Sequence, residues 1–381
     1  MIQGESFVRA LRPAGFGLVS GTPCSYLTPL VNAVISSSEI DYIGAANEGE
    51  AVAIACGAQL GGRLSAVMFQ NSGLGNAVSP LTSLAATFRI PLLVIATWRG
   101  QPDGAEDEPQ HELMGRITPK LFELMEIPWA PFPATEAAIG PTFDRALHHI
   151  RTSGKPYGLV LRHGDVATAP LFVQPSAQRS ARAALPDRGP AVAALEQNEI
   201  LSAIQSAIDP AAAVLATTGF TGRALYALSD RPNQFYMAGS MGCVSSLGLG
   251  LAKVQPRRQL IVLDGDGALL MRMGALPVIA HEGPPNLVHI LLDNGVHDST
   301  GGQPTVSSSV DFAAIAYASG YPRVIRADSL GELRGALQDK SRELTFIHVK
   351  TQPRSSRKLP RPTISAPALA ERFRTWVRQT L

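Results

Sequence analysis

The segment LIVLDGDGALL, residues 260–270, carries the clearest chemical signal in the sequence. Its apolar run predicts a short buried strand, and Gly265 and Gly267 predict a turn into a helix. Backbone N–H groups at the start of a helix bind phosphate, and the carboxylate of Asp266 is a ligand that Mg²⁺ prefers. The segment therefore indicates a site for a phosphate group and a divalent cation.

Three interpretations of this turn are open from the residues alone. A dinucleotide-binding turn needs a third glycine, where this chain has Leu270. A haloacid-dehalogenase-like phosphatase begins with Asp-x-Asp-Gly-Thr and uses the first aspartate, here Asp264, as its nucleophile, but Ala268 replaces the threonine and no matching acidic pair follows. The third interpretation pairs Asp266 with Asn294, which follows the next apolar run. Because the carboxyl ends of parallel strands meet at one edge of a sheet, those two side chains would lie together.

Two acids open an apolar, helix-like segment at residues 48–60. Asn47 and Glu50 have the spacing of a capping box, so a structural role is expected for Glu50. Glu48 has no such partner in the sequence and lies in an apolar neighbourhood. It is either a surface acid that the helix dipole stabilises or a functional carboxyl group.

Taken together, these motifs resemble the thiamin-diphosphate motif. The resemblance extends over nearly the whole chain to the phosphonopyruvate decarboxylases, the type found in phosphonate antibiotic pathways. The matching segments are residues 21–29, 70–76, 97–100, 107–111, 114–118 and 293–303. The wider superfamily often has two asparagines where this chain has Asp293 and Asn294.

The resemblance implies thiamin diphosphate and Mg²⁺ as cofactors. Mg²⁺ would be bound by the side chains of Asp266 and Asn294 and by the backbone carbonyl of Val296, with two diphosphate oxygens and a water completing the oxygen ligands. Met241 matches the apolar wedge that bends the cofactor, and the Gly239 carbonyl matches the acceptor for its amino group. The full set of implied cofactor contacts is Thr218, Gly219, Thr221, Gly239, Met241, Gly265, Gly267 and Ala268.

By the same resemblance, Glu48 matches the catalytic glutamate that hydrogen-bonds the pyrimidine ring nitrogen and promotes deprotonation of the thiazolium ring. The implied enzyme is a lyase that converts 3-phosphonopyruvate to phosphonoacetaldehyde and CO₂ through an enamine on the cofactor. A sulfopyruvate decarboxylase is the alternative with the same chemistry, and a metal-dependent phosphatase is a more remote one.

Candidate contacts for the substrate are polar residues in the matching segments: Asn71, His111, His297, Ser299 and Thr300. Arg99 and Arg116 could supply positive charge for the phosphonate, or they could pair with the acidic residues 103–108.

The elements that must position these residues follow an α/β pattern. Apolar runs at residues 16–20, 64–69, 91–97, 213–216, 259–263, 287–292 and 346–349 alternate with longer helix-like segments. This alternation predicts two doubly wound parallel sheets covered by helices on both faces, without a middle domain. The expected organisation is a pyrimidine-binding domain at 1–168, a linker at 169–192, a diphosphate-binding domain at 193–352 and a tail with a helix at 353–381.

Composition excludes several classes of protein. The 381 residues are 45% apolar and 17% charged, with a formal net charge of +2, which suits large buried cores and argues against nucleic-acid binding. No apolar run is long enough to predict a membrane span, and the N-terminus lacks the pattern of a signal peptide. Cys24, Cys56 and Cys243 form no paired motif, so a reducing cytoplasm is expected. The resemblance implies a homodimer or a dimer of dimers, with an active site shared between subunits.

Overall fold

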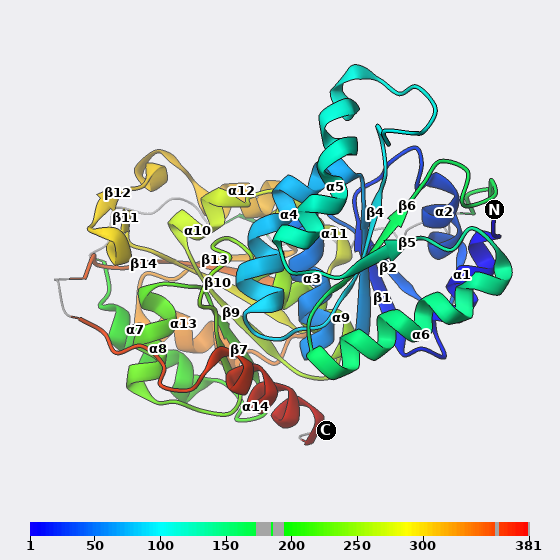
Figure 1. Ribbon diagram of the computed structural model, residues 1–381. Coiled ribbons are helices and arrows are strands. Elements are labelled where there is room, and N and C mark those ends of the chain that lie inside the picture. Colours follow the sequence, from blue (N-terminus) through cyan, green and yellow to red (C-terminus); the bar gives the residue numbers. More distant parts are fainter. Residues whose placement is uncertain (173–183, 186–193, 355–357, 380–381) are drawn as a thin grey trace. The chain divides into compact units, whose positions relative to one another are not determined.

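The chain forms two compact units, Met1–Ala177 and Gln178–Leu381, in the computed structural model, which describes residues 1–172, 184–185, 194–354 and 358–379 (Figure 1). Each unit contains one six-stranded sheet with parallel neighbours. The predicted α/β class is therefore confirmed, and the described residues contain no middle domain. Most of the predicted linker, at 173–183 and 186–192, lies outside the described residues. So do residue 193 of the predicted diphosphate-binding domain and residues 355–357 and 380–381 of the predicted tail.

The sheet of the first unit has the strand order β2-β1-β3-β4-β6-β5. Its strands are β1 (Phe16–Gly21), β2 (Asp41–Gly44), β3 (Leu64–Phe69), β4 (Leu93–Thr97), β5 (Trp129–Pro131) and β6 (Tyr157–Leu161). Its helices are α1 (Gly4–Leu11), α2 (Thr28–Ser36), α3 (Glu48–Leu60), α4 (Leu74–Pro80), α5 (Glu112–Leu124) and α6 (Glu136–Ser153). The predicted strand at 91–97 begins at Leu93, two residues late.

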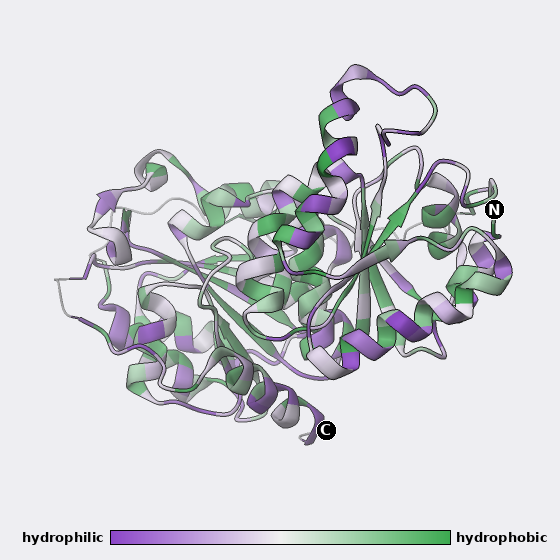
Figure 2. Ribbon diagram, viewed as in Figure 1, coloured by the Kyte–Doolittle hydropathy of each residue, from purple (hydrophilic) through white to green (hydrophobic). Residues whose placement is uncertain are grey.

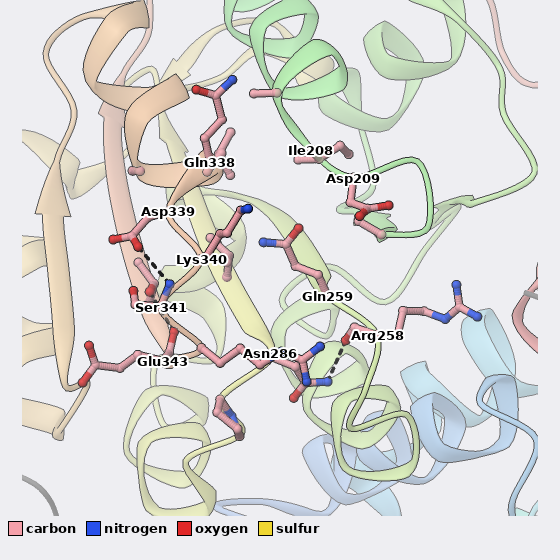
Figure 3. Close-up of a pocket in the computed structure, with 18 of the residues that line it drawn as sticks. Ile208, Asp209, Arg258, Gln259, Asn286, Gln338, Asp339, Lys340, Ser341 and Glu343 are labelled. Carbon is pink, nitrogen blue, oxygen red and sulfur yellow. Dashed lines mark hydrogen bonds between the residues drawn. The ribbon is translucent and has the colours of Figure 1, made fainter. Parts of the chain in front are cut away.

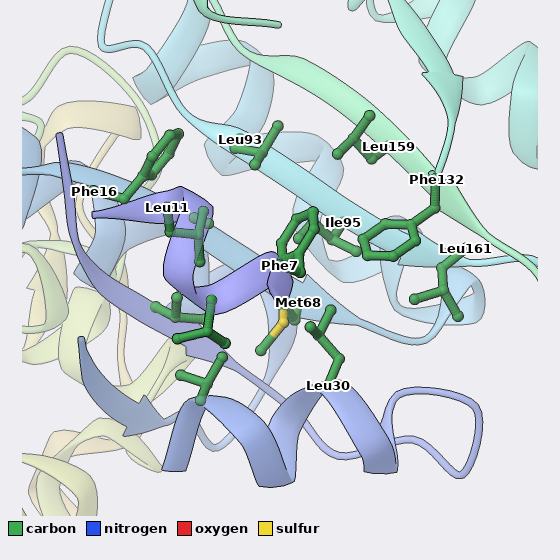
Figure 4. Close-up of a cluster of buried hydrophobic side chains, with 14 of the residues drawn as sticks. Phe7, Leu11, Phe16, Leu30, Met68, Leu93, Ile95, Phe132, Leu159 and Leu161 are labelled. Carbon is green, nitrogen blue, oxygen red and sulfur yellow. The ribbon is translucent and has the colours of Figure 1, made fainter. Parts of the chain in front are cut away.

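Burial on both faces explains why these strands read as continuous apolar runs. β1, β4 and β6 are buried at every residue, because helices cover both sides of the sheet. Figure 2 shows the strands mainly in the hydrophobic colour, whereas α6 carries hydrophilic and hydrophobic residues side by side. One core cluster joins α1 and α2 to the sheet, with Phe7 beside Phe132 at 4.7 Å between ring centroids (Figure 4).

The start of α3 confirms the predicted helix and its cap. Asn47 Oδ1 accepts a hydrogen bond from the Glu50 backbone N–H, and Glu50 Oε2 accepts one from Ala46 N–H, both at 3.0 Å. The helix is then buried from Gly49 to Leu60. Glu50 thus has the expected structural role, which leaves Glu48 at the first helical position.

The sheet of the second unit has the strand order β13-β14-β10-β9-β7-β8. Its strands are β7 (Ala213–Ala216), β8 (Gln234–Tyr236), β9 (Leu260–Gly265), β10 (Leu287–Asp293), β13 (Arg323–Arg326) and β14 (Thr345–Lys350). Its helices are α7 (Gln197–Ala207), α8 (Phe220–Leu228), α9 (Val244–Val254), α10 (Asp266–Met271), α11 (Ala275–Glu282), α12 (Phe312–Ser319), α13 (Leu330–Gln338) and α14 (Ala366–Gln379). A small antiparallel pair, β11 (Val296–His297) and β12 (Gln303–Pro304), follows β10.

The register of β9 and β10 determines where the predicted ligands lie. Leu291 is opposite Asp264 and Leu292 is opposite Gly265, so both strands end at the same level. Asp266 and Asn294 each follow directly, as the spacing of the motif predicts. No helix in the described part of the chain combines the length and the apolar character that a membrane crossing requires.

Candidate active site

The predicted site residues of the second unit gather at the carboxyl ends of β7, β9 and β10. All of them except Gly239 and Thr300 line one small cavity of about 70 Å³. The helices α8 and α10 begin at this cavity, with Gly219 and Gly265 as their N-caps. Backbone N–H groups at helix starts are donors for an anionic group, so the cavity has the chemistry of a phosphate cradle.

Gly267 and His297 pack closely together at this cavity. A Cβ atom at Gly267 would lie 2.5 Å from His297 Cε1 and 3.4 Å from Met241 Cε. A side chain at this position would therefore require the His297 ring to move. The fit places the predicted wedge and the predicted substrate contact against the same turn.

Asp266 has the environment of a residue that binds a cation. Its side chain is buried, with 2% of the residue exposed, and Thr305 Oγ1 donates to Oδ2 at 2.5 Å. Burial raises the pKa of Asp266, and the nearby negative charge of Asp293 raises it further. A divalent cation at this carboxylate would offset the cost of burying the charge.

The neighbouring oxygens complete a donor set that suits Mg²⁺. Asn294 Oδ1 accepts from Val296 N–H at 3.1 Å, while its Nδ2 donates to Asp298 Oδ2 at 2.7 Å. Among the described residues no three His, Cys, Asp or Glu side chains cluster as a metal site. The residues present fit a magnesium ion bound by one carboxylate, one amide and one backbone carbonyl, with a bound diphosphate supplying the remainder.

Two buried carboxylates support the ends of β9 and β10. Asp264 is fully buried, accepts from Gly265 N–H at 2.9 Å, and lies 3.3 Å from His289 Nε2. A nucleophile must be reachable by substrate, so this geometry contradicts the phosphatase interpretation. Burial alone would raise the pKa of Asp293, but hydrogen bonds from His348, Lys350 and Ser307 outweigh it and hold that pKa at about 2.

In the first unit, the carboxylate of Glu48 is held by two side chains from other elements. Thr22 Oγ1 donates to Oε1 at 3.1 Å, and Asn76 Nδ2 donates to Oε2 at 2.7 Å. A Cβ atom at Gly73 would lie 2.3 Å from Glu48 Cγ, so a side chain there would displace the Glu48 side chain. Glu48 is half-buried, and its carboxylate is fixed rather than free to move.

Asn71 and His111, the two candidate substrate contacts of the first unit, are both buried. Asn71 is fully buried, and its amide bonds to Thr97, Thr118 and the backbone of Arg99. His111 is 6% exposed, and its buried Nδ1 has no hydrogen-bond partner in the part of the chain that the structure describes. In this structure the Asn71 side chain organises the loop after β4. Sequence motifs alone gave no sign of this burial.

The two arginines considered for the phosphonate both pair with carboxylates. Arg99 donates to Asp107 from Nε at 2.7 Å and from Nη2 at 2.5 Å, with 13% and 8% of the two side chains exposed. The hydrogen bond from Arg99 holds the pKa of Asp107 well below its usual range. Arg116 pairs instead with Glu112, outside the predicted acidic run, where both side chains are exposed.

Replacing Asp107 with alanine is expected to destabilise the first unit by about 3 kcal/mol, since the change leaves the buried Arg99 charge unpaired. Chemical denaturation measures this difference, and Glu112→Ala in the exposed pair is the matched control, with an expected loss below about 1 kcal/mol. Because the pKa of Asp107 is lowered on folding, the stabilisation is complete above about pH 4 and is lost as the pH falls further. Equal losses in the two variants would contradict the prediction.

A larger cavity, of about 660 Å³, lies in the second unit at the opposite ends of the strands (Figure 3). Two of the basic side chains that line it have partners within the unit. Arg323 pairs with Asp339 at 2.8 Å, and Arg342 donates to the Arg257 carbonyl at 2.9 Å. Figure 3 shows the segment from Gln338 to Glu343 facing Ile208 and Asp209 across it. Since no predicted site residue lines it, this cavity is not the candidate active site.

Comparisons with known proteins match a known domain in each half of the chain. The N-terminal TPP binding domain of thiamine pyrophosphate enzymes matches residues 1–118, and their C-terminal TPP binding domain matches residues 217–349. A phosphonopyruvate decarboxylase from Streptomyces hygroscopicus is 45% identical over 98% of this chain and 94% of its own length. A sulfopyruvate decarboxylase from Methanosarcina acetivorans is 32% identical over 92% of this chain and 91% of its own length.

A solved structure shows the same fold at low sequence identity. The thiamine diphosphate-dependent 4-hydroxybenzoylformate decarboxylase of Rhodococcus jostii superposes with a TM-score of 0.70 and 16% identity, covering 92% of this chain and 99% of that one. The two sheets and the strand-end motifs define a thiamine pyrophosphate enzyme. Within that class, the chain belongs to the family of phosphonopyruvate decarboxylases.

Proposed function

We propose that this protein decarboxylates 3-phosphonopyruvate to phosphonoacetaldehyde and CO₂ with thiamin diphosphate and Mg²⁺. The observation that carries the substrate assignment is 45% identity to a phosphonopyruvate decarboxylase over nearly the full length of both chains, against 32% to a sulfopyruvate decarboxylase. Service in phosphonate natural-product biosynthesis, which the resemblance implies, and a cytoplasmic location, which the absence of a paired cysteine motif in the sequence led us to expect, form part of the proposal.

Thiamin diphosphate, when bound, supplies an electron sink for the electron pair that remains when CO₂ leaves. The contribution of this chain is to orient that group and to control protons. Glu48, which Thr22 and Asn76 hold by hydrogen bonds, would exchange a proton with a ring nitrogen of the cofactor. Met241 and the Gly239 carbonyl would fix the bent shape of the cofactor.

The second unit would hold the diphosphate and the metal. Asp266, Asn294 and the Val296 carbonyl are the proposed Mg²⁺ ligands, and the starts of α8 and α10 are the proposed diphosphate donors. The proposed domain roles follow, with the pyrimidine-binding part at residues 1–168 and the diphosphate-binding part at 193–352. We also propose a homo-oligomer, a dimer or a dimer of dimers, as the resemblance implies.

Purified protein with Mg²⁺ and thiamin diphosphate is expected to release aldehyde from 3-phosphonopyruvate, measured by coupling the aldehyde to NADH consumption. Omitting the cofactor is the control. Sulfopyruvate should be used with a kcat/KM at least about tenfold lower, which corresponds to about 1.4 kcal/mol in transition-state binding. Absence of aldehyde from phosphonopyruvate would overturn the proposal, and a preference for sulfopyruvate would favour the alternative.

A further inference from the structure

The segment that follows β10 is a short hairpin closed at its base. Val296 pairs with Pro304 and His297 with Gln303 in antiparallel register, and Thr305 N–H donates to the Gly295 carbonyl at 2.8 Å. The tip, which includes Ser299 and Thr300, is exposed. The hairpin is residues 295–305, and it carries a proposed metal ligand and three proposed substrate contacts.

Asp293 contacts both ends of this hairpin. Its Oδ1 accepts from Gly295 N–H at 3.2 Å, on the outgoing side, and from Ser307 Oγ, on the returning side. The residue is 1% exposed, so water does not compete for these bonds. A single carboxylate oxygen thus joins the two points where the hairpin leaves and rejoins the sheet edge.

The second oxygen of Asp293 is bound by two donors from β14. His348 Nε2 lies 2.9 Å from Oδ2, and Lys350 Nζ, whose residue is in register with Asp293, donates to it at 2.5 Å. Lys350 also donates to Ser307 Oγ at 3.4 Å. The positive charge of Lys350 balances the charge of Asp293 at Oδ2, so Oδ1 is available to accept hydrogen bonds from the hairpin and from Ser307.

This arrangement needs a carboxylate. An asparagine at 293, the residue common in the wider superfamily, has one acceptor oxygen and one donor group. With the oxygen toward Ser307, its amide would face the ammonium group of Lys350, which can only donate. With the oxygen toward Lys350, its amide would face the N–H of Gly295, which is also a donor. The aspartate of this chain therefore permits a closure of the hairpin that an asparagine cannot reproduce.

We propose that Asp293 is a positioning residue that closes the hairpin 295–305 and thereby holds Asn294, Val296 and His297 at the cofactor cavity. What the hairpin binds rests on the proposed function, whereas its closure by Asp293 does not. Thr305, which joins the hairpin base to Asp266 at 2.5 Å, couples the same closure to the proposed metal ligand.

Hydrogen exchange of the full-length protein without cofactor tests the closure. In Ser307→Ala, peptides that cover residues 294–309 are expected to exchange at least about tenfold faster, since a charge-assisted hydrogen bond to the base is lost. Ser307→Thr, which restores the hydroxyl, should return exchange close to the original rate. Asp230→Asn, which breaks the Asp230–Arg372 ion pair of the same unit, is the matched control and should leave these peptides unchanged.

Unchanged exchange in Ser307→Ala overturns the proposal, as does an equal increase in Asp230→Asn. Asp293→Ala should give the larger effect. If that variant does not fold because His348 and Lys350 lose their partner, Ser307→Ala decides. Calorimetry adds a second measurement, in which Mg²⁺ affinity in the presence of thiamin diphosphate should fall about tenfold in Ser307→Ala. If exchange is faster in Ser307→Ala but the original protein does not decarboxylate 3-phosphonopyruvate, the proposed function is rejected and the closure of the hairpin by Asp293 still stands.

Discussion

Glu48→Gln is expected to lower kcat by about 10²- to 10⁴-fold, the range that removal of a general acid–base group produces. Glutamine has nearly the same shape. Its single oxygen can accept from Asn76 while its amide group donates to the Thr22 hydroxyl, so the fold and the position of the side chain should be retained. What is lost is the ability to give and take a proton. Steady-state kinetics with saturating cofactor measure the effect, and circular dichroism checks the fold.

The neighbouring acid provides the control for this variant. Glu50→Gln changes a carboxylate on the same helical turn whose role is to cap α3. It should cost about 1 kcal/mol of stability and leave the turnover of the folded enzyme largely intact. A Glu48→Gln enzyme with near-normal kcat, or a Glu50→Gln enzyme with an equal loss, would refute the role assigned to Glu48.

Removal of the metal is expected to abolish activity, and Asp266→Asn is expected to prevent its recovery. A chelator should inactivate the enzyme, and added Mg²⁺ should restore the original protein. The variant keeps the shape of the side chain but loses the charge that attracts the cation, so Mg²⁺ affinity should fall by at least about tenfold, or about 1.4 kcal/mol. Calorimetric titration with Mg²⁺ in the presence of thiamin diphosphate measures this.

Two further measurements distinguish a metal-binding role of Asp266 from a purely structural one. Because burial raises the pKa of Asp266, protons compete with the cation, and apparent Mg²⁺ affinity should decline as the pH is lowered. Without metal, Asp266→Asn should unfold at the same temperature or higher, since a buried charge is removed. A large loss of stability in the metal-free variant would show that Asp266 serves the fold instead.

The fold was predictable because local patterns determine it. β3 and α3 occur at the bounds that the sequence predicts, and the predicted tail contains its helix, at Ala366–Gln379. Fully buried strands bounded by turn residues give a clear signal, and so does the capping box of α3. The prediction that Asp266 and Asn294 lie together rested on the same kind of signal, since each lies just beyond a predicted strand, and both line the same cavity.

Contacts between distant segments were not predictable. Thr305 reaches Asp266 across 39 positions, and Ser307 reaches Asp293 across 14, with no spacing rule to connect them. Asn71 and His111 lie in matching segments, but whether a polar side chain is buried depends on packing that the segment does not encode. The sequence allowed Arg99 either to bind the phosphonate or to pair with the acidic residues 103–108, and in the structure it pairs with Asp107.

The tight packing of Gly73 against Glu48 has a consequence for protein engineering. Any residue larger than glycine at 73 would displace the carboxylate while leaving the acid itself in the sequence. Gly73→Ala would therefore give a variant that keeps Glu48 but holds its carboxylate in a different position. Comparing this variant with Glu48→Gln separates the part of the rate that depends on the presence of the acid from the part that depends on its position.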